Sequence, residues 1–192
     1  MKITDGAGGG YGAAVNSNNQ LSVNAINETA QHFISHGAGE AYQAWGVTDT
    51  LTSATIPILH LKNTSTTKDM VITYVRFQTV DSNETLPAAA SYFQMSFGRT
   101  YSSGGTAMTP VNMNTSSGNA AETTAYQSTP VLAGTAVEFD RVYNPADGQQ
   151  ITYNKEGSII VGPNDTIEFT YVGTSTAGVA YCRCSFYFAV HN

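Results

Sequence analysis

Apolar and polar residues alternate in short runs from about residue 40 onward, and turn-forming residues separate these runs. Asn-Pro-Ala-Asp-Gly at 144–148 and Gly-Pro-Asn-Asp at 162–165 have the composition of tight turns. Because no long run repeats at the helical period, the pattern predicts strands. The predicted strands cover residues 41–47, 55–63, 70–80, 92–101, 107–112, 137–143, 151–153, 158–161, 166–172 and 179–190, and the polar stretches at 81–91, 102–106 and 114–130 are predicted loops. Strands of this length and spacing indicate an all-β fold, which we predict to be an antiparallel, jelly-roll-like β-sandwich.

The last predicted strand has two distinct faces. Its predicted core face consists of Cys182, Cys184, Phe186, Phe188 and Val190, and its outer face of Tyr181, Arg183, Ser185 and Tyr187. Tyrosines that flank an arginine are typical of a protein interface. We therefore predict that Tyr181, Arg183 and Tyr187 contact a neighbouring subunit.

The strand at 70–80 carries apolar residues on both faces. One face holds Val71, Thr73, Val75 and Phe77, and the other holds Met70, Ile72, Tyr74 and Arg76. Either a partner covers one face, with Tyr74 in the interface, or the strand is buried between two sheets of one molecule. The sequence favours neither alternative.

Residues 1–38 differ from the rest of the chain. The glycine-rich run at 5–12 disfavours any regular element, because glycine loses the most backbone entropy on folding. The alternating run at 21–26 is too short to form a core of its own. We therefore predict an extended N-terminal arm at 1–38 and a β-sandwich body at 39–192. The arm residues expected to contact a neighbouring subunit are Ile3, Tyr11, Val15, Leu21, Val23 and Ile26.

Composition narrows the possible partners. Charged residues make up 11% of the chain, against about 25% in ordinary domains. The net charge is −6 and the few basic residues do not cluster, so we predict no nucleic-acid binding. No apolar run approaches the roughly 18 residues of a membrane span, so no membrane partner is predicted. The N-terminus has no secretion-signal pattern, so folding is expected in a reducing cytoplasm.

Candidate catalytic and metal-binding residues are few. His32 and His36 have the spacing at which two imidazoles on a helix share a metal, with Glu40 as a possible third ligand, but the flanking glycines favour a structural role. Glu138 and Asp140 flank one strand residue and are more simply two solvated carboxylates than an acid–base pair.

Cys182 and Cys184 are spaced poorly for a disulfide and incompletely for zinc, so they are predicted as buried thiols. The glycine-rich run lacks the lysine of a phosphate-binding loop. We predict no catalytic residue, no metal and no cofactor, and hence no enzyme.

The N-terminal third resembles a known family. Asp-Gly-Ala-Gly-Gly-Gly-Tyr-Gly-Ala-Ala-Val at 5–15, Asn-Ser-Asn-Asn-Gln-Leu at 16–21 and Asn-Glu-Thr-Ala-Gln-His at 27–32 resemble the opening of small virion proteins of tailed bacteriophages. The stretches at 59–72 and 157–166 are also similar to those proteins. The resemblance implies a capsid decoration (cement) protein, a homotrimer on the phage head that assembles in the host cytoplasm. It also implies that this protein contacts the major capsid protein, in part through the arm residues named above. The alternative is a tail-fibre or receptor-binding virion protein that recognises glycans, for which Trp45, the single tryptophan, is available although it is expected at the edge of the body.

Overall fold

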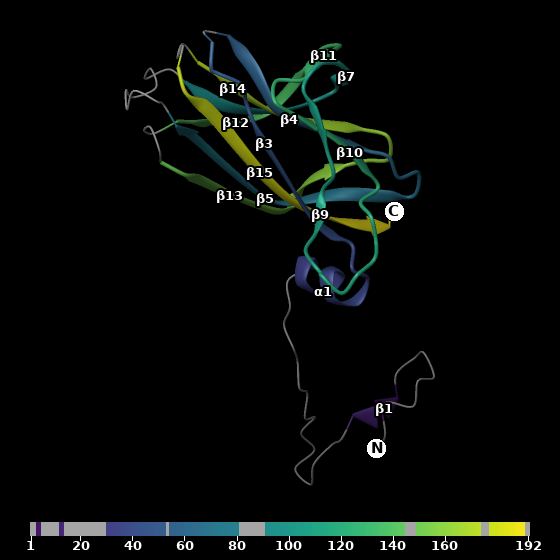
Figure 1. Cartoon of the computed structure of the whole chain (residues 1–192). Coiled ribbons are helices and arrows are strands. Elements are labelled where there is room, and N and C mark those ends of the chain that lie inside the picture. Colours follow the sequence, from purple (N-terminus) through teal and green to yellow (C-terminus); the bar gives the residue numbers. More distant parts are fainter. Residues whose placement is uncertain are drawn as a thin grey trace.

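Two antiparallel β-sheets lie face to face, as the computed structural model in Figure 1 shows. The structure describes residues 3–4, 12–13, 30–52, 54–80, 91–144, 149–173 and 177–190. Its elements are β1 (Ile3–Thr4), β2 (Gly12–Ala13), α1 (Ala30–Gly37), β3 (Ala41–Val47), β4 (Thr55–Asn63), β5 (Lys68–Val80), β6 (Tyr92–Phe97), β7 (Thr100–Ser103), β8 (Thr106–Met108), β9 (Val111–Asn112), β10 (Thr123–Gln127), β11 (Val131–Ala133), β12 (Val137–Tyr143), β13 (Ile151–Val161), β14 (Thr166–Val172) and β15 (Val179–Val190). One sheet has the order β12-β6-β14-β4-β10-β8 and the other β13-β5-β15-β3-β9, while β1 pairs with β2 and β7 with β11. The predicted all-β sandwich is confirmed.

Aromatic side chains fill the space between the two sheets. Phe77 of β5 and Phe93 of β6 come from opposite sheets and stack with their ring centroids 4.6 Å apart. Phe169 of β14 packs against Phe77 at 6.1 Å, and Tyr171 against Phe93 at 5.8 Å. All four are fully buried, and burying a side chain of this size contributes roughly 1.5–3 kcal/mol.

The predicted inner face of the last strand is largely confirmed. Cys182, Cys184, Phe186 and Phe188 of β15 belong to the core. The assignment of Val190 to the core is wrong, because this side chain is 72% exposed. Val190 pairs with the first residue of β5, at the rim of the sandwich, where no opposing side chain covers it.

A β-bulge in β5 reverses the alternation predicted for residues 70–80. The pairing with β15 skips from Tyr74 to Ile72, so Thr73 is an extra residue without a partner across the ladder. Val75 on one side of the bulge and Ile72 on the other are both fully buried in the core. A single alternation along this strand is therefore wrong, because the bulge exchanges the inner and outer faces.

The helix α1 covers one end of the outer face of the five-stranded sheet (Figure 1). Its Ile34 packs on a small cluster formed by Ala41, Val71 and Tyr187, and the hydroxyl of Thr73 donates a 2.5 Å hydrogen bond to Gln31. Residues 30–37, predicted as part of an extended arm, are thus helical and attached to the body. At this end the outer face of β5 is covered by the same chain.

The segment between β6 and β12 extends both sheets. β8 joins the six-stranded sheet and β9 the five-stranded one, so the strand predicted at 107–112 is two short strands in different layers. Likewise, Gly98 with φ of 93° divides the strand predicted at 92–101. β10 lies in a predicted loop but pairs along β4, whose edge presents backbone donors and acceptors that need partners.

Candidate functional site

The predicted metal and acid–base candidates have other partners. His32 and His36 stack on α1 with ring centroids 6.3 Å apart, but Glu40 is in an ion pair with Lys68, with 2.6 Å between Oε1 and Nζ. Across the described residues, no three His, Cys, Asp or Glu side chains are grouped closely enough to hold a metal ion. These histidines therefore lack the third ligand that the sequence suggested.

Glu138 and Asp140 lie on β12 on either side of a bulge and bind different cations. Glu138 pairs with Arg141 at 2.5 Å, and Asp140 pairs with Lys155 at 2.7 Å. Their separate ion pairs fix β12 and join it to β13 at the open edge of the sandwich. The structure does not bring the two carboxylates together as an acid–base pair.

The cysteines are confirmed as buried thiols. Cys182 and Cys184 are both free, and neither side chain exceeds 2% exposure. Burial raises the pKa of both thiols well above the ordinary value, so neither is a nucleophile or a ready metal ligand at neutral pH.

A buried polar cluster lies on the outer face of the six-stranded sheet. Arg99 Nε donates to both carboxylate oxygens of Glu168, at 2.9 and 2.8 Å, and His60 Nε2 lies 3.0 Å from the carbonyl oxygen of Arg99. Burial raises the pKa of Glu168, an effect that Arg99 partly offsets, and burial lowers the pKa of His60. Since Glu168 and His60 are each 1% exposed, the cluster attaches the start of β7 to the sheet and is closed to ligands.

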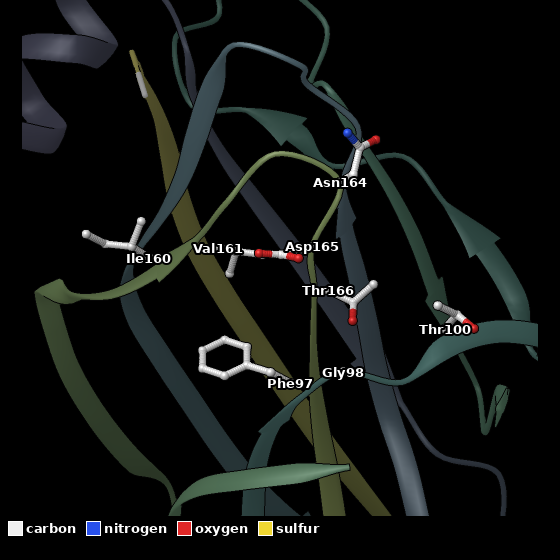
Figure 2. A pocket seen from close by; sticks show the side chains of 8 residues that line it. All are labelled: Phe97, Gly98, Thr100, Ile160, Val161, Asn164, Asp165 and Thr166. Atoms are coloured by element: carbon white, nitrogen blue, oxygen red, sulfur yellow. The ribbon is translucent and has the colours of Figure 1, made fainter. Parts of the chain in front are cut away.

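A cavity of about 340 Å³ opens where the turn between β13 and β14 meets the junction of β6 and β7 (Figure 2). Its lining consists of Phe97, Gly98, Thr100, Ile160, Val161, Asn164, Asp165 and Thr166. Asp165 is the one charged residue of this set, and its backbone closes the turn by bonding to Gly162 and Asn63. A single carboxylate in a turn, without a base or a second ligand, gives this cavity no evident chemistry.

The outer face of the five-stranded sheet carries a more distinctive set of side chains. A row across four adjacent strands runs from Trp45 on β3 to Arg183 on β15, Arg76 on β5 and Thr152 on β13, each in register with the next. Tyr181 lies one step along β15, beside Gln78. The hollow between these residues has a volume of about 280 Å³. We call Trp45, Tyr74, Arg76, Tyr181 and Arg183 the arginine–tryptophan face.

Tyr74 orients one of the two arginines. Arg76 donates from Nε to the Tyr74 hydroxyl at 2.8 Å and a second time from its terminal nitrogen, while its guanidinium carbon lies 5.1 Å from the ring centroid. Although burial raises the pKa of Tyr74, hydrogen bonds with Thr152 and Arg76 and the positive charges of Arg76 and Arg183 lower it overall. Two guanidinium groups therefore lie on one face of a protein whose net charge is −6.

The predicted interface residues are distributed unevenly. Tyr74, Tyr181 and Arg183 lie together on the arginine–tryptophan face, whereas Tyr187 is 8% exposed beneath α1. Tyr11, Val15, Leu21, Val23 and Ile26 lie outside the described residues, and for Ile3 only the backbone, in β1, is described.

Sequence reasoning did not select Arg76, and it named Trp45 only for the receptor-binding alternative. Trp45 lies at the sheet edge as expected, beyond the last pair of β3 with β9, but 43% of it is exposed beside the hollow. The alternation in the run Ala-Tyr-Gln-Ala-Trp-Gly-Val at 41–47 could have indicated this exposure. Ala44 and Gly46 occupy core-facing positions, so Trp45 between them faces outward.

Comparison with known proteins gives no relative. No family model matches the chain, and no curated protein or solved structure matches it. Within the described parts of the chain, no helix has the length and apolar character needed to cross a membrane.

Proposed function

We propose that this protein is a structural subunit of a tailed-phage particle, a decoration protein that holds neighbouring major capsid subunits together on the head. The proposal starts from the resemblance of residues 5–32 to the opening of small virion proteins. The observation that carries it is a group of exposed apolar side chains at the α1 end of the body. We call Phe33, Val111 and Met113 the α1-end patch.

Hydrogen bonds tie the segments of the α1-end patch together. Gln31 on α1 donates to the sulfur of Met113 at 3.6 Å, and Asn114 donates to the Ser35 carbonyl at 2.8 Å. Phe33 and Val111 are 66% and 52% exposed. Large apolar side chains gathered around one element are typical of a protein interaction site. The patch lies where α1 meets the body (Figure 1), so it supports an interface that includes α1.

The strand order supports the jelly-roll part of the proposal. β3-β15-β5-β13 form four adjacent strands in one layer, and β4-β14-β6-β12 form four in the other. Along the chain, β3 to β6 alternate between the layers, as do β12 to β15. Two four-stranded layers connected in this way support the double Greek key of a jelly roll, a fold that capsid and lectin domains share.

The proposal is tested with purified protein and phage heads that lack it. We expect a homotrimer by light scattering, and saturation of the heads at a fixed ratio. Removal of residues 1–24 should leave a folded body that no longer binds heads. Phe33→Ser with Val111→Ser should weaken assembly or head binding, whereas Val131→Ser should not, although Val131 on β11 is 54% exposed and Val111 is 52% exposed. A monomer that ignores heads, or a truncated protein that binds them unchanged, contradicts the proposal.

A receptor-binding subunit of a tail fibre is the second candidate function. The specific observation in its favour is that Trp45 and Tyr181, 43% and 42% exposed, border one hollow. Adhesion of the purified protein to host cells, without binding to heads, would select this candidate over the first.

A further inference from the structure

The arginines of this chain fall into two groups. Two of the four, Arg99 and Arg141, bind the carboxylates of Glu168 and Glu138. Arg76 and Arg183 have no carboxylate within ion-pair distance among the described residues, although acidic residues outnumber basic ones by 14 to 8 in the chain. These two arginines are also direct neighbours across β5 and β15.

This juxtaposition disfavours the fold by itself. Like charges on directly opposite residues of an antiparallel pair destabilise a sheet. An arginine has five donors and no acceptor, so Arg76 and Arg183 cannot satisfy each other. The hydrogen bonds from Arg76 to Tyr74 hold one guanidinium in place but supply no negative charge. An anionic group with oxygen acceptors would complement both arginines, because the guanidinium fork is suited to such a group.

The surroundings of the arginines define the rest of the ligand. Trp45 lies next to Arg183 in the row, and Tyr181 borders the same hollow, so each presents an exposed ring beside a cation. Gln78 and Gln150 add side-chain amides to the lining. A sugar ring has a flat face of C–H groups for an aromatic ring and hydroxyls for amides. A hollow of about 280 Å³, open at the surface, has room for one or two such rings.

We propose that the arginine–tryptophan face binds an acidic saccharide, with the carboxylate of a sugar on Arg76 and Arg183 and a sugar ring against Trp45. The inference gives a chemical class to the second candidate function and rests on it. It does not depend on the α1-end patch, which lies on other residues. Binding is reversible and requires no covalent step.

The single tryptophan makes the test direct. Trp45 is the only tryptophan in the chain, so its fluorescence reports this face alone. We expect short uronate oligosaccharides to change that fluorescence saturably, and neutral glucans of equal length to leave it unchanged. Added salt should weaken the interaction, because part of it is ionic. Inorganic sulfate should not compete at equal concentration, since it lacks the sugar ring.

Matched variants locate the site. Arg183→Gln alters an exposed side chain and should keep the fold while weakening uronate binding about tenfold or more. Arg76→Gln with Arg183→Gln should abolish binding. Arg141→Gln is the matched control, because it removes the same charge from the other sheet. This variant should bind uronates as tightly as the unmodified protein does. Trp45→Phe removes the fluorescent reporter, so its binding is measured by isothermal titration calorimetry. We expect this variant to bind uronates more weakly.

Several results would overturn the inference. These are the absence of saturable uronate binding at millimolar concentration, equal binding of neutral glucans, full competition by inorganic sulfate, or equal losses in Arg141→Gln and Arg183→Gln. Cell adhesion that survives in Arg183→Gln overturns the acidic saccharide while the receptor-binding function stands. If the unmodified protein does not adhere to host cells, the receptor-binding function itself is overturned.

Discussion

Asn63 offers a sharp test of how the sandwich is held together at one end. This fully buried residue ends β4, and its side-chain amide donates to the carbonyl oxygens of Lys68, Val161 and Gly162 at 2.8, 3.0 and 3.1 Å. Its Oδ1 accepts from the backbone of Ser65 at 3.0 Å. One side chain therefore links the turn after β4 to the end of β13. Asn63→Ala should destabilise the protein strongly.

The magnitude follows from the lost bonds. The amide has two hydrogens and Oδ1 accepts one more bond, so Asn63→Ala removes about three hydrogen bonds of about 1 kcal/mol each. Buried carbonyls left without a donor add to this loss, giving about 3–5 kcal/mol. Native domains are stable by only about 5–15 kcal/mol, so the effect is a large share of the total.

Urea unfolding followed by circular dichroism measures the change, with an unchanged slope as the sign that the folded state is intact. Asn63→Asp keeps the shape but turns the donors into acceptors that face carbonyls, and should cost at least as much as Asn63→Ala. Asn119→Ala removes an exposed amide that donates to Ala38 at 2.8 Å, and should cost less than about 1 kcal/mol because water replaces it. A loss below about 1 kcal/mol for Asn63→Ala, or an unaltered Asn63→Asp protein, would refute the reasoning.

Three further predictions concern protonation, thiol reactivity and backbone conformation. Burial lowers the pKa of His60 in the folded protein below its ordinary value of 6.5. As the pH falls below 6.5, the unfolded chain therefore binds the proton before the folded protein does. The stability that is present above pH 6.5 is lost as the pH falls from 6.5 through the pKa of the folded state. Urea midpoints at several pH values should fall more steeply for the unmodified protein than for His60→Gln; parallel curves would contradict this. Cys182 and Cys184 should resist alkylation in the folded state and react fully in urea, by mass spectrometry, because both are buried with raised pKa values; a rapid native reaction would contradict their burial. Gly105→Ala should cost roughly 1–3 kcal/mol, because φ is 61° and the added carbon would lie 2.4 Å from a backbone oxygen, whereas Gly118→Ala meets open space and should change the melting temperature little.

Local patterns fixed the strands because a strand's boundaries and alternation are short-range properties. Runs bounded by turn residues predicted β3, β4, β12, β14 and β15 with the bounds that the structure has. Apart from Val190, the inner face of β15, including both cysteines, was also correctly assigned, since the strand alternates without a bulge. The same reasoning placed Tyr74, Tyr181 and Arg183 on outer faces. The sequence by itself thus determined the fold class and most side-chain directions.

Tertiary structure decided everything that depends on which strands meet. The bulge at Thr73, which exchanges the faces of β5, forms only against β15, and the polar β10 becomes a strand only beside the edge of β4. Tyr187 is buried because α1 folds back over it. Arg183 and Arg76 become neighbours through the same β5–β15 pairing, and no local signal announces it. The physical reason is that strand pairing depends on the free energy of contacts between segments far apart in the sequence. The alternation of apolar and polar residues shows only which side chains share a face of one strand.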